Sequence, residues 1–341
     1  MIRFECDYNE GMHPQILKRL IETNDEQQPG YMLDEHCEKA REYIKKACNQ
    51  PDSDVHFIVG GTQANLIVIT AILRPHQGVI SASSGHINTH ESGSIEATGH
   101  KVLALPSEDG TISAAQVQEY MEHSLHDPTR EHTVQPAMVY ISFPTENGTL
   151  YTKQELTDLY AVCKKYELPL FIDGARLGYG LQSAANDLTL EEFAHLCDVF
   201  YIGGTKVGAM MGEAVVFNDT KLSKDFRYLI KQRGALLAKG RFVGIQFETL
   251  FENGLYMEIA KNAMTCAEVI KKALQEKGYE FLFEPETNQL FPIMPNDKLA
   301  QLQKNFAFSV MDAVDEDHTI VRICTSWATK MENVEKLINE L

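Results

Sequence analysis

The sequence predicts an α/β fold in which a large domain on a mainly parallel sheet is followed by a smaller α+β domain. Helix-like and strand-like segments alternate from about residue 34 to residue 217, which is the pattern of βα units. After residue 217 the pattern changes to long helices followed by short strands. The chain has 341 residues, and a chain of this length holds about two domains.

The strands predicted for the large domain are short and rich in β-branched residues. They cover residues 55–59, 78–82, 101–105, 137–143, 168–172, 199–202 and 213–217. Helices are predicted over residues 34–48, 62–73, 113–123, 152–166 and 189–196. Strands that alternate with helices in this way form parallel sheets covered on both faces. We therefore expect a mainly parallel sheet of seven strands.

The C-terminal region is predicted to begin with two long helices, over residues 222–250 and 255–277, separated by the turn signal Asn253-Gly254. Strands at 279–284, 289–294, 306–312 and 319–324 follow, with helices near 297–304 and 330–340. We expect the two domains to divide between residues 220 and 255. The large domain is assigned residues 1–245 and the small domain residues 246–341.

Charge and cysteine content limit the partners and the setting. The formal net charge is −17, which argues against nucleic acid or an anionic membrane because both bind basic surfaces. The seven cysteines form no C-x-x-C pair, so we expect neither a disulfide framework nor a metal site, and a reducing cytoplasm is the natural setting. The apolar run Leu66–Leu73 is too short to span a membrane. These properties favour a cytoplasmic protein with small-molecule ligands.

Two polar residues follow apolar strands of the predicted sheet. Asp173 follows the strand 168–172, and Lys206 follows the strand 199–202 after two glycines and Thr205. Alone, the aspartate is as readily a helix cap and the lysine a solvated surface group. Asp173 and Lys206 lie 33 residues apart, and the segment between them holds one helix and one strand, so both fall at the same edge of the sheet. A lysine for a Schiff base and an aspartate for a pyridinium nitrogen are what pyridoxal phosphate (PLP) needs.

A glycine turn, Gly60-Gly61, joins the strand 55–59 to the next predicted helix. Two glycines allow the backbone to approach an anion, and Thr62 is expected to cap the helix. Free amide groups at a helix start can then hold a phosphate. His86 follows the strand 78–82, where it can stack on a cofactor ring or move a proton.

Five motifs together resemble the threonine aldolase family, above all the bacterial low-specificity L-threonine aldolases. They are G-T-Q-A-N at 61–65, H-x-N-x-x-E at 86–91, D-G-A-R at 173–176, G-G-T-K at 203–206 and V-R-I-C-T-S-W at 321–327. The motifs keep the family's order over nearly the whole chain. The resemblance implies the aspartate-aminotransferase-like fold, which is fold type I of the PLP enzymes.

The resemblance also implies a role for each matching residue. Lys206 forms the Schiff base, Asp173 pairs with the pyridine nitrogen and His86 stacks on the ring. The remaining implied contacts are Gly61, Thr62, Gln63, Thr205 and Arg176 to the cofactor, Arg176 and Arg322 to the substrate carboxylate, Asp7, His90 and Glu91 beside the substrate or a bound water, and Lys231 and Arg241 toward a partner subunit or the phosphate.

One motif departs from the family. Many members carry a histidine in a T-H-N-G segment, where it meets the β-hydroxyl of the substrate, and this chain has Glu146 at that position. A glutamate can accept the same proton, although its reach and charge differ. His90 also replaces an aromatic residue that some relatives carry. The base that removes the hydroxyl proton is therefore expected to be His86, Glu146, His90 or a water held beside Glu91.

The implied activity is cleavage of L-threonine, L-allo-threonine or a related β-hydroxy-α-amino acid to glycine and an aldehyde. Another fold type I reaction, β-elimination or transamination, is the nearest alternative because a fold does not fix a function. A regulator without turnover is disfavoured by the intact pair Lys206 and Asp173, and a dinucleotide-dependent oxidoreductase by the lack of G-x-G-x-x-G. The resemblance further implies a homodimer or homotetramer.

Overall fold

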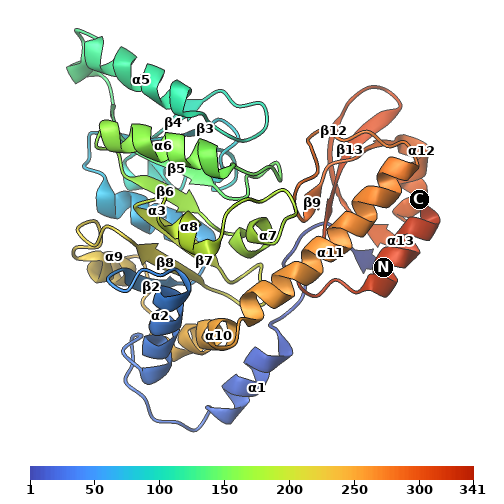
Figure 1. Cartoon of the computed structure of the whole chain (residues 1–341), viewed down its shortest axis with the longest axis horizontal. Coiled ribbons are helices and arrows are strands. Elements are labelled where there is room, and N and C mark those ends of the chain that lie inside the picture. Colours follow the sequence, from blue (N-terminus) through green and yellow to red (C-terminus); the bar gives the residue numbers. More distant parts are fainter.

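A computed structural model describes residues 1–341 of the chain (Figure 1). Its largest sheet has seven strands in the order β2-β8-β7-β6-β5-β3-β4. They are β2 (Asp54–Ile58), β3 (Gln77–Ala82), β4 (Lys101–Leu105), β5 (Gln135–Ser142), β6 (Leu170–Asp173), β7 (Val199–Gly203) and β8 (Glu213–Phe217). All pairings are parallel except those of β8, which runs antiparallel to both β7 and β2. The predicted α/β fold with a mainly parallel seven-stranded sheet is confirmed.

Helices cover both faces of this sheet. On one face the strands pack against α3 (Gly61–Ile72) and α9 (Phe226–Gln232). On the other they pack against α2 (Glu35–Ala47), α5 (Ala114–His126), α6 (Lys153–Lys165), α8 (Leu190–Ala194) and α10 (Arg241–Glu252). Successive side chains of a strand point to opposite faces, so Tyr140 and Tyr201 belong to the α3 face, and Ile141 and Ile202 to the other. Three further short helices, α1 (Pro14–Glu22), α4 (His86–Thr89) and α7 (Leu177–Leu181), were not predicted.

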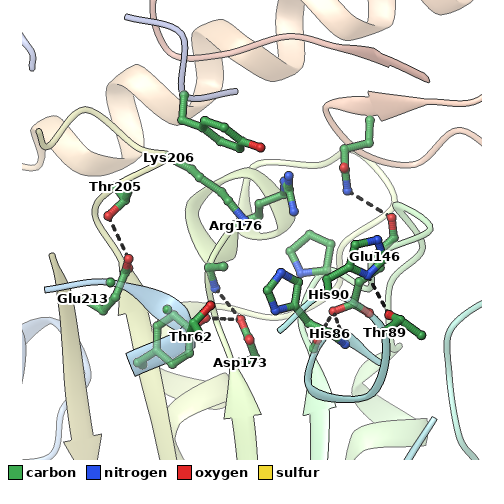
Figure 2. A pocket seen from close by; sticks show the side chains of 18 of the residues that line it. Thr62, His86, Thr89, His90, Glu146, Asp173, Arg176, Thr205, Lys206 and Glu213 are labelled. Atoms are coloured by element: carbon green, nitrogen blue, oxygen red, sulfur yellow. Dashed lines mark hydrogen bonds between the residues drawn. The ribbon is translucent and has the colours of Figure 1, made fainter. Parts of the chain in front are cut away.

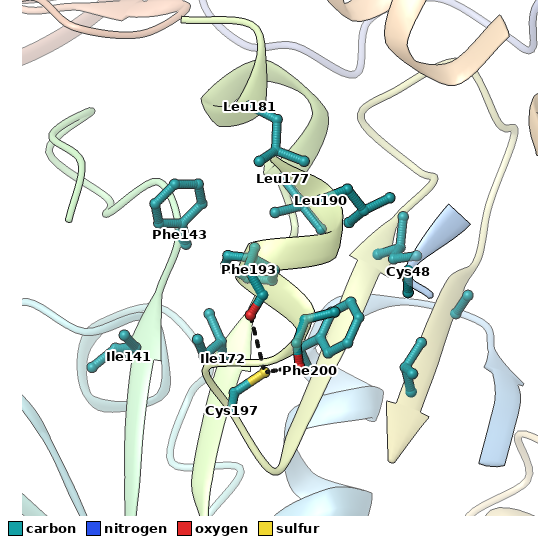
Figure 3. Close-up of a cluster of buried hydrophobic side chains, with 14 of the residues drawn as sticks. Cys48, Ile141, Phe143, Ile172, Leu177, Leu181, Leu190, Phe193, Cys197 and Phe200 are labelled. Atoms are coloured by element: carbon teal, nitrogen blue, oxygen red, sulfur yellow. Dashed lines mark hydrogen bonds between the residues drawn. The ribbon is translucent and has the colours of Figure 1, made fainter. Parts of the chain in front are cut away.

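Aromatic packing anchors the strand ends (Figure 3). The Phe193 ring of α8 lies 5.1 Å from the Phe143 ring after β5 and 5.4 Å from the Phe200 ring of β7, measured between centroids. All three side chains are fully buried. Removing such a ring costs about 3–5 kcal/mol of folding stability. The cluster therefore fixes the positions of β5, β6 and β7, and with them the residues at the carboxyl ends of these strands.

The predicted helix over residues 222–250 is wrong, because the structure has two helices there. α9 ends at Gln232 and α10 begins at Arg241. Gly234 follows α9 with φ +76°, a left-handed conformation that ends a helix and that glycine adopts at little cost. Gly240 lies against Met32, where a Cβ would come within 2.8 Å of the Met32 backbone nitrogen. The composition is continuous along this stretch, but Gly234 ends the first helix, and Gly240 allows the start of the second helix to pack closely against Met32.

The C-terminal region has a sheet of its own. β10 (Ile293–Pro295), β13 (His318–Cys324) and β12 (Ser309–Ala313) pair antiparallel, and β9 (Gln289–Leu290) also pairs with β13. The helices α11 (Leu255–Glu276), α12 (Asn296–Leu302) and α13 (Met331–Glu340) contribute to its core. The chain start joins this region, because β1 (Ile2–Arg3) pairs in parallel with β11 (Phe306–Ala307) and Phe4 lies in the same core.

Three of the strands predicted here differ in the structure. Residues 279–284 form no strand and make only an isolated bridge between Phe281 and Pro292. The strand expected at 289–294 is split at Pro292, which has no N–H to donate to a ladder. The strand expected at 306–312 is split because β11 pairs with β1 and β12 with β13.

Residue 245, where the two domains were predicted to divide, lies inside α10, and the domain division near it stays a prediction. None of the helices combines the length and apolar character needed to cross a bilayer.

Candidate active site

A cavity of about 600 Å³ lies at the carboxyl ends of β5, β6 and β7 (Figure 2). Parallel sheets bind their ligands at this edge. The C-terminal region supplies part of the wall through Gln289, Phe291, Met311 and Arg322. Ten of the predicted site residues line the cavity: Gly61, Thr62, His86, His90, Glu146, Asp173, Arg176, Thr205, Lys206 and Arg322.

Asp173 is a buried carboxylate at the end of β6. Its Oδ2 accepts hydrogen bonds from the Tyr140 hydroxyl (2.6 Å) and from Asn65 Nδ2 (3.0 Å), and its Oδ1 accepts from the Tyr201 hydroxyl and from the Ala175 N–H (3.0 Å). Burial acts to raise the pKa of Asp173, but the charge of His86 and the donors Tyr140, Tyr201 and Asn65 outweigh it and lower the pKa. The group is therefore an anion at neutral pH, and the predicted helix-cap alternative does not describe it.

Lys206 lies in the turn between β7 and β8 and faces the cavity (Figure 2). Its backbone carbonyl accepts a hydrogen bond from the Tyr179 hydroxyl, which fixes the turn on the side away from the cavity. Burial and the positive charge of Arg176 lower the pKa of the Lys206 amine, against the opposing charges of Asp7, Asp173 and Glu213. A lowered pKa increases the share of the neutral amine, which is the form that attacks a carbonyl.

His86 lies at the start of α4 and is held by Glu91. The two are joined by a 2.8 Å contact between His86 Nδ1 and Glu91 Oε1. Glu91 does not line the cavity but lies behind His86, where Asn65 Nδ2 donates to the same oxygen (2.8 Å). Burial lowers the pKa of His86, but the hydrogen bond that its Nδ1 donates to Glu91 and the charges of Asp173 and Glu91 raise the pKa overall. Asn65 thus connects the His86–Glu91 pair to Asp173.

The first turn of α3 faces the cavity through Gly61 and Thr62. The prediction that Thr62 caps this helix is wrong, since the N-cap is Gly60 and no side chain caps it. The first N–H groups of a helix have no partner within the helix, so they remain available to an anion. Gln63 does not line the cavity, because its side chain turns away and donates to the carbonyl of Arg233 (3.0 Å).

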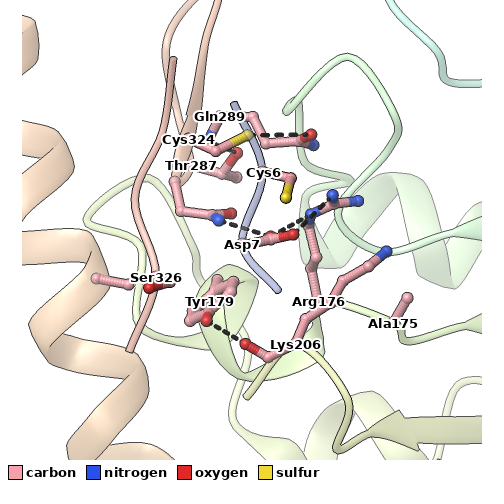
Figure 4. A network of polar contacts seen from close by, with 12 residues as sticks. Cys6, Asp7, Ala175, Arg176, Tyr179, Lys206, Thr287, Gln289, Cys324 and Ser326 are labelled. Atoms are coloured by element: carbon pink, nitrogen blue, oxygen red, sulfur yellow. Dashed lines mark hydrogen bonds and ion pairs between the residues drawn. The ribbon is translucent and has the colours of Figure 1, made fainter. Parts of the chain in front are cut away.

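Two arginines line the cavity: Arg176 of the large sheet region (Figures 2 and 4) and Arg322 of β13. Arg176 is gripped by Asp7, with Nε at 2.6 Å from Oδ2 and Nη2 at 3.1 Å from Oδ1. Asp7 is fully buried and also accepts from Asn288 Nδ2 (2.9 Å), so it orients Arg176 and does not itself line the cavity. Arg322 donates through Nη2 to the carbonyl of Glu5 (3.0 Å), and its buried Nε has no partner.

Glu146 and His90 lie opposite Lys206 (Figure 2). Glu146 Oε1 accepts from the Ser142 hydroxyl (2.6 Å) and the His86 N–H (3.1 Å), which leaves Oε2 for a ligand. Burial and the charge of Asp173 raise the pKa of Glu146. The His90 ring stacks on the His86 ring at 5.6 Å between centroids, and burial and the charge of His86 lower its pKa.

Lys231 and Arg241, like Gln63, Asp7 and Glu91, are predicted site residues that do not line this cavity. Lys231 Nζ lies 4.4 Å from the centroid of the Tyr31 ring. Arg241 donates to the carbonyls of Glu26 (2.6 Å) and Asn24 (3.1 Å). Neither lines the cavity of its own chain, and their partners Tyr31, Glu26 and Asn24 do not line it either.

The structure adds functional side chains that the sequence analysis did not select: Asn65, Tyr140, Tyr201, Glu213 and Asn288. The two tyrosines sit within apolar strands and read as core residues. Asn288 contacts a residue 281 positions away. Two of these residues carried a signal. Asn65 ends the G-T-Q-A-N motif, and Glu213 begins the apolar strand Glu213–Phe217 next to the lysine motif, where carboxylates are almost never buried without a partner.

The cavity fits PLP on several independent grounds. A buried anion, Asp173, lies below the cavity, and an amine with a lowered pKa, Lys206, enters it. A Cβ at Gly60 would contact no other protein atom within 4 Å, so the space beside the uncapped start of α3 is free for a phosphate. A Cβ at Gly61 would lie 3.0 Å from the Tyr201 hydroxyl, so the close packing there favours glycine.

Fold and cavity together define a fold type I PLP enzyme. The aspartate aminotransferase of Thermus thermophilus, in a mutant form, superposes with a TM-score of 0.71 over 99% of this chain and 95% of that one at 15% identity, which shows the shared fold. Residues 14–296 match the family model described as β-eliminating lyase.

Sequence relatives narrow the family further. The low-specificity L-threonine aldolase of Pseudomonas sp. (strain NCIMB 10558) is 29% identical over 99% of this chain and 96% of its own length. A solved structure of Leishmania major threonine aldolase is 45% identical, with a TM-score of 0.96 over 99% of this chain and 98% of that one. The chain therefore belongs to the threonine aldolase group of the β-eliminating lyase family. It is a lyase, and its cofactor is PLP.

Proposed function

We propose that this enzyme cleaves L-threonine, L-allo-threonine or a related β-hydroxy-α-amino acid to glycine and an aldehyde. The observation that carries the proposal is the cavity itself, where Lys206 and the buried anion Asp173 lie beside two arginines in a chain of the threonine aldolase group. Lys206 would hold the cofactor, Asp173 its ring nitrogen, His86 its ring face, and Gly61, Thr62 and Thr205 its phosphate. When bound, PLP supplies a ring that accepts the electrons of the broken bond.

The two arginines would bind the substrate carboxylate. Arg322 has a buried Nε without a partner, and an unpaired buried donor gains most from an anionic ligand. Arg176 keeps Nη1 free, since Asp7 occupies its Nε and Nη2. A carboxylate held at two points fixes the rotation about the bond to Cα. That orientation decides whether Cα–Cβ or another bond is broken.

Glu146 is the best-placed base for the β-hydroxyl proton. Its Oε2 is free, and its raised pKa strengthens it as a proton acceptor. His86 is less suited, because its raised pKa increases the share of the protonated ring and Glu91 occupies Nδ1. His90 has a lowered pKa and is neutral, and it is the competing base in the test below.

Product analysis tests the proposed reaction. Purified enzyme is incubated with L-threonine, L-allo-threonine and L-serine, and glycine, aldehydes, keto acids and ammonia are measured. Glycine with an equal amount of aldehyde is expected, and Lys206→Ala should form neither. Keto acid with ammonia would instead show β-elimination and overturn the proposal.

We further propose a cytoplasmic homo-oligomer whose sites lie near a subunit boundary, and a division of the chain into large and small domains near residue 245. Lys231 and Arg241 have no ligand role within their own chain, and α1 exposes Leu17 and Ile21. Mixing Lys206→Ala with Arg241→Ala tests the assembly. Recovered activity in the mixture is expected, and an active monomer at assay concentration would contradict it.

A further inference from the structure

Glu213 is a buried carboxyl between the proposed phosphate site at Gly61 and Thr62 and the turn that carries Lys206, and it has no role in the proposed cleavage. In the sheet it is paired with Ile58, which precedes Gly60-Gly61, and with Gly203, which precedes Lys206. Its side chain is 3% exposed and lines the cavity. The position places a carboxyl group beside the site proposed for a phosphate dianion, where an ionised carboxylate would repel the ligand.

The hydrogen bonds of Thr205 show what this carboxyl controls (Figure 2). The Thr205 hydroxyl donates to Glu213 Oε1 (2.8 Å) and accepts from the Gly212 N–H (3.1 Å). A hydroxyl has a single hydrogen, so in this arrangement Thr205 has none left to donate to an anion. Gly212 has φ +117°, a conformation that favours glycine, and it holds its N–H on Thr205.

Protonation of Glu213 would reverse the direction of its hydrogen bond with Thr205. A neutral carboxylic acid donates its O–H, so Glu213 could give a hydrogen bond to the Thr205 oxygen. Thr205 would then accept from Glu213 and from Gly212, and its own hydrogen would be free for the cavity. The other oxygen of Glu213 would still accept from the Gly204 N–H, now 3.1 Å away.

We propose that Glu213 is a neutral acid in the cofactor-bound enzyme and that it turns the hydroxyl hydrogen of Thr205 toward the cofactor phosphate. Glu213 is thus a positioning residue that makes the affinity for a phosphorylated ligand depend on pH. The inference rests on the proposed location of the phosphate beside Gly61, Thr62 and Thr205.

The surroundings of Glu213 support a neutral acid at neutral pH. Burial and the charge of Asp173 raise its pKa to about 8, against the hydrogen bonds from Thr205 and the Gly204 N–H and the charge of Lys206. The other titratable groups that face it are Tyr201 of β7 and Tyr256 of α11, both of which are neutral because burial raises their pKa values. Ionisation of Glu213 should therefore weaken phosphate binding as the pH rises above about 8.

The test measures binding of pyridoxamine 5′-phosphate to the full-length apoenzyme by calorimetry from pH 6.5 to 9.5. This ligand carries the ring and the phosphate but cannot bond covalently to Lys206. Glu213→Gln is the matched variant, because its amide donates to Thr205 and accepts from Gly204 at every pH. Pyridoxamine without the phosphate is the control ligand.

Wild type and Glu213→Gln should bind the phosphorylated ligand equally at pH 6.5. At pH 9.5 the wild type should bind up to about 30-fold more weakly than the variant, which is the limit for one-proton linkage with a pKa of about 8 when only the protonated form binds. Parallel pH curves for the two proteins would overturn the inference. So would an undiminished difference in the Thr205→Val background, since it would show direct repulsion without the hydroxyl. If the phosphate adds no affinity at any pH, the proposed cradle itself fails, which separates that failure from the failure of the Glu213 assignment.

Discussion

Replacing Asp173 by asparagine should abolish most of the turnover while leaving a folded protein. The carboxylate accepts four hydrogen bonds, two on each oxygen. The tyrosine hydroxyls can rotate and become acceptors, whereas Asn65 Nδ2 and the Ala175 N–H are fixed donors. Whichever way the new amide points, its NH₂ group faces one of these fixed donors.

We expect different magnitudes for the loss of stability and for the loss of turnover. An unsatisfied buried donor costs about 1–3 kcal/mol of stability, so Asp173→Asn should fold with a reduced melting temperature. The effect on catalysis is larger, because breaking a buried charge pair costs about 3–5 kcal/mol, and about 1.4 kcal/mol is a factor of ten. Without the anion the ring nitrogen loses its proton, and kcat should fall by about two to four orders of magnitude.

The assay compares kcat for glycine formation, PLP content and melting temperature of wild type and Asp173→Asn. Tyr140→Phe is the matched control, since it removes one donor to the carboxylate but keeps the charge. It should lose stability to a similar extent and retain most of its turnover at pH 8. An Asp173→Asn enzyme with full PLP content and a near-normal kcat would refute the reasoning and leave Asp173 a purely structural residue.

Three other variants test the site. Lys206→Ala should lose the visible absorbance of the bound cofactor, and borohydride should fix PLP on Lys206 in the wild type alone; label on another lysine would contradict the assignment. Glu146→Gln should lower kcat by about 10²–10⁴-fold with little change in KM, whereas a loss confined to His90→Asn would move the base to His90. Glu91→Gln should reduce the melting temperature most near pH 6, because the raised pKa of His86 gives stability that is complete below its unfolded value and lost as the pH rises through the folded value. A pH-independent difference would show that the charge of His86 is not involved.

The position of the site at the carboxyl ends of the strands, and the two residues Asp173 and Lys206, were predictable because they depend on local sequence pattern. Apolar strands ending in Asp173 and in the turn before Lys206 are visible along the sequence, and parallel pairing brings them to one edge. The capping role given to Thr62 was wrong because Gly60 adopts the extended cap conformation one residue before the helix. The local sequence pattern alone could not show whether Gly60 or Thr62 occupies the cap position.

Residues that act through long-range contacts could not be predicted in the same way. Tyr140 and Tyr201 reach Asp173 only because alternation along β5 and β7 points both rings to the α3 face. Asp7 and Asn288 lie at opposite ends of the chain and meet at Arg176 because β1 joins the C-terminal sheet region. Such contacts are set by strand pairing and domain packing, which the sequence pattern does not specify.

Two buried carboxyls in one cavity, Asp173 and Glu213, show how the surroundings assign protons. Both are removed from water, which alone would make both neutral. Asp173 accepts four hydrogen bonds and lies near His86, so it stays an anion able to pair with a cation. Glu213 accepts only two and lies on the side of the cavity where a phosphate is expected. Opposite protonation of two such groups suits opposite tasks: the charged one holds a proton on a ring nitrogen, and the neutral one directs a hydroxyl hydrogen toward an anion.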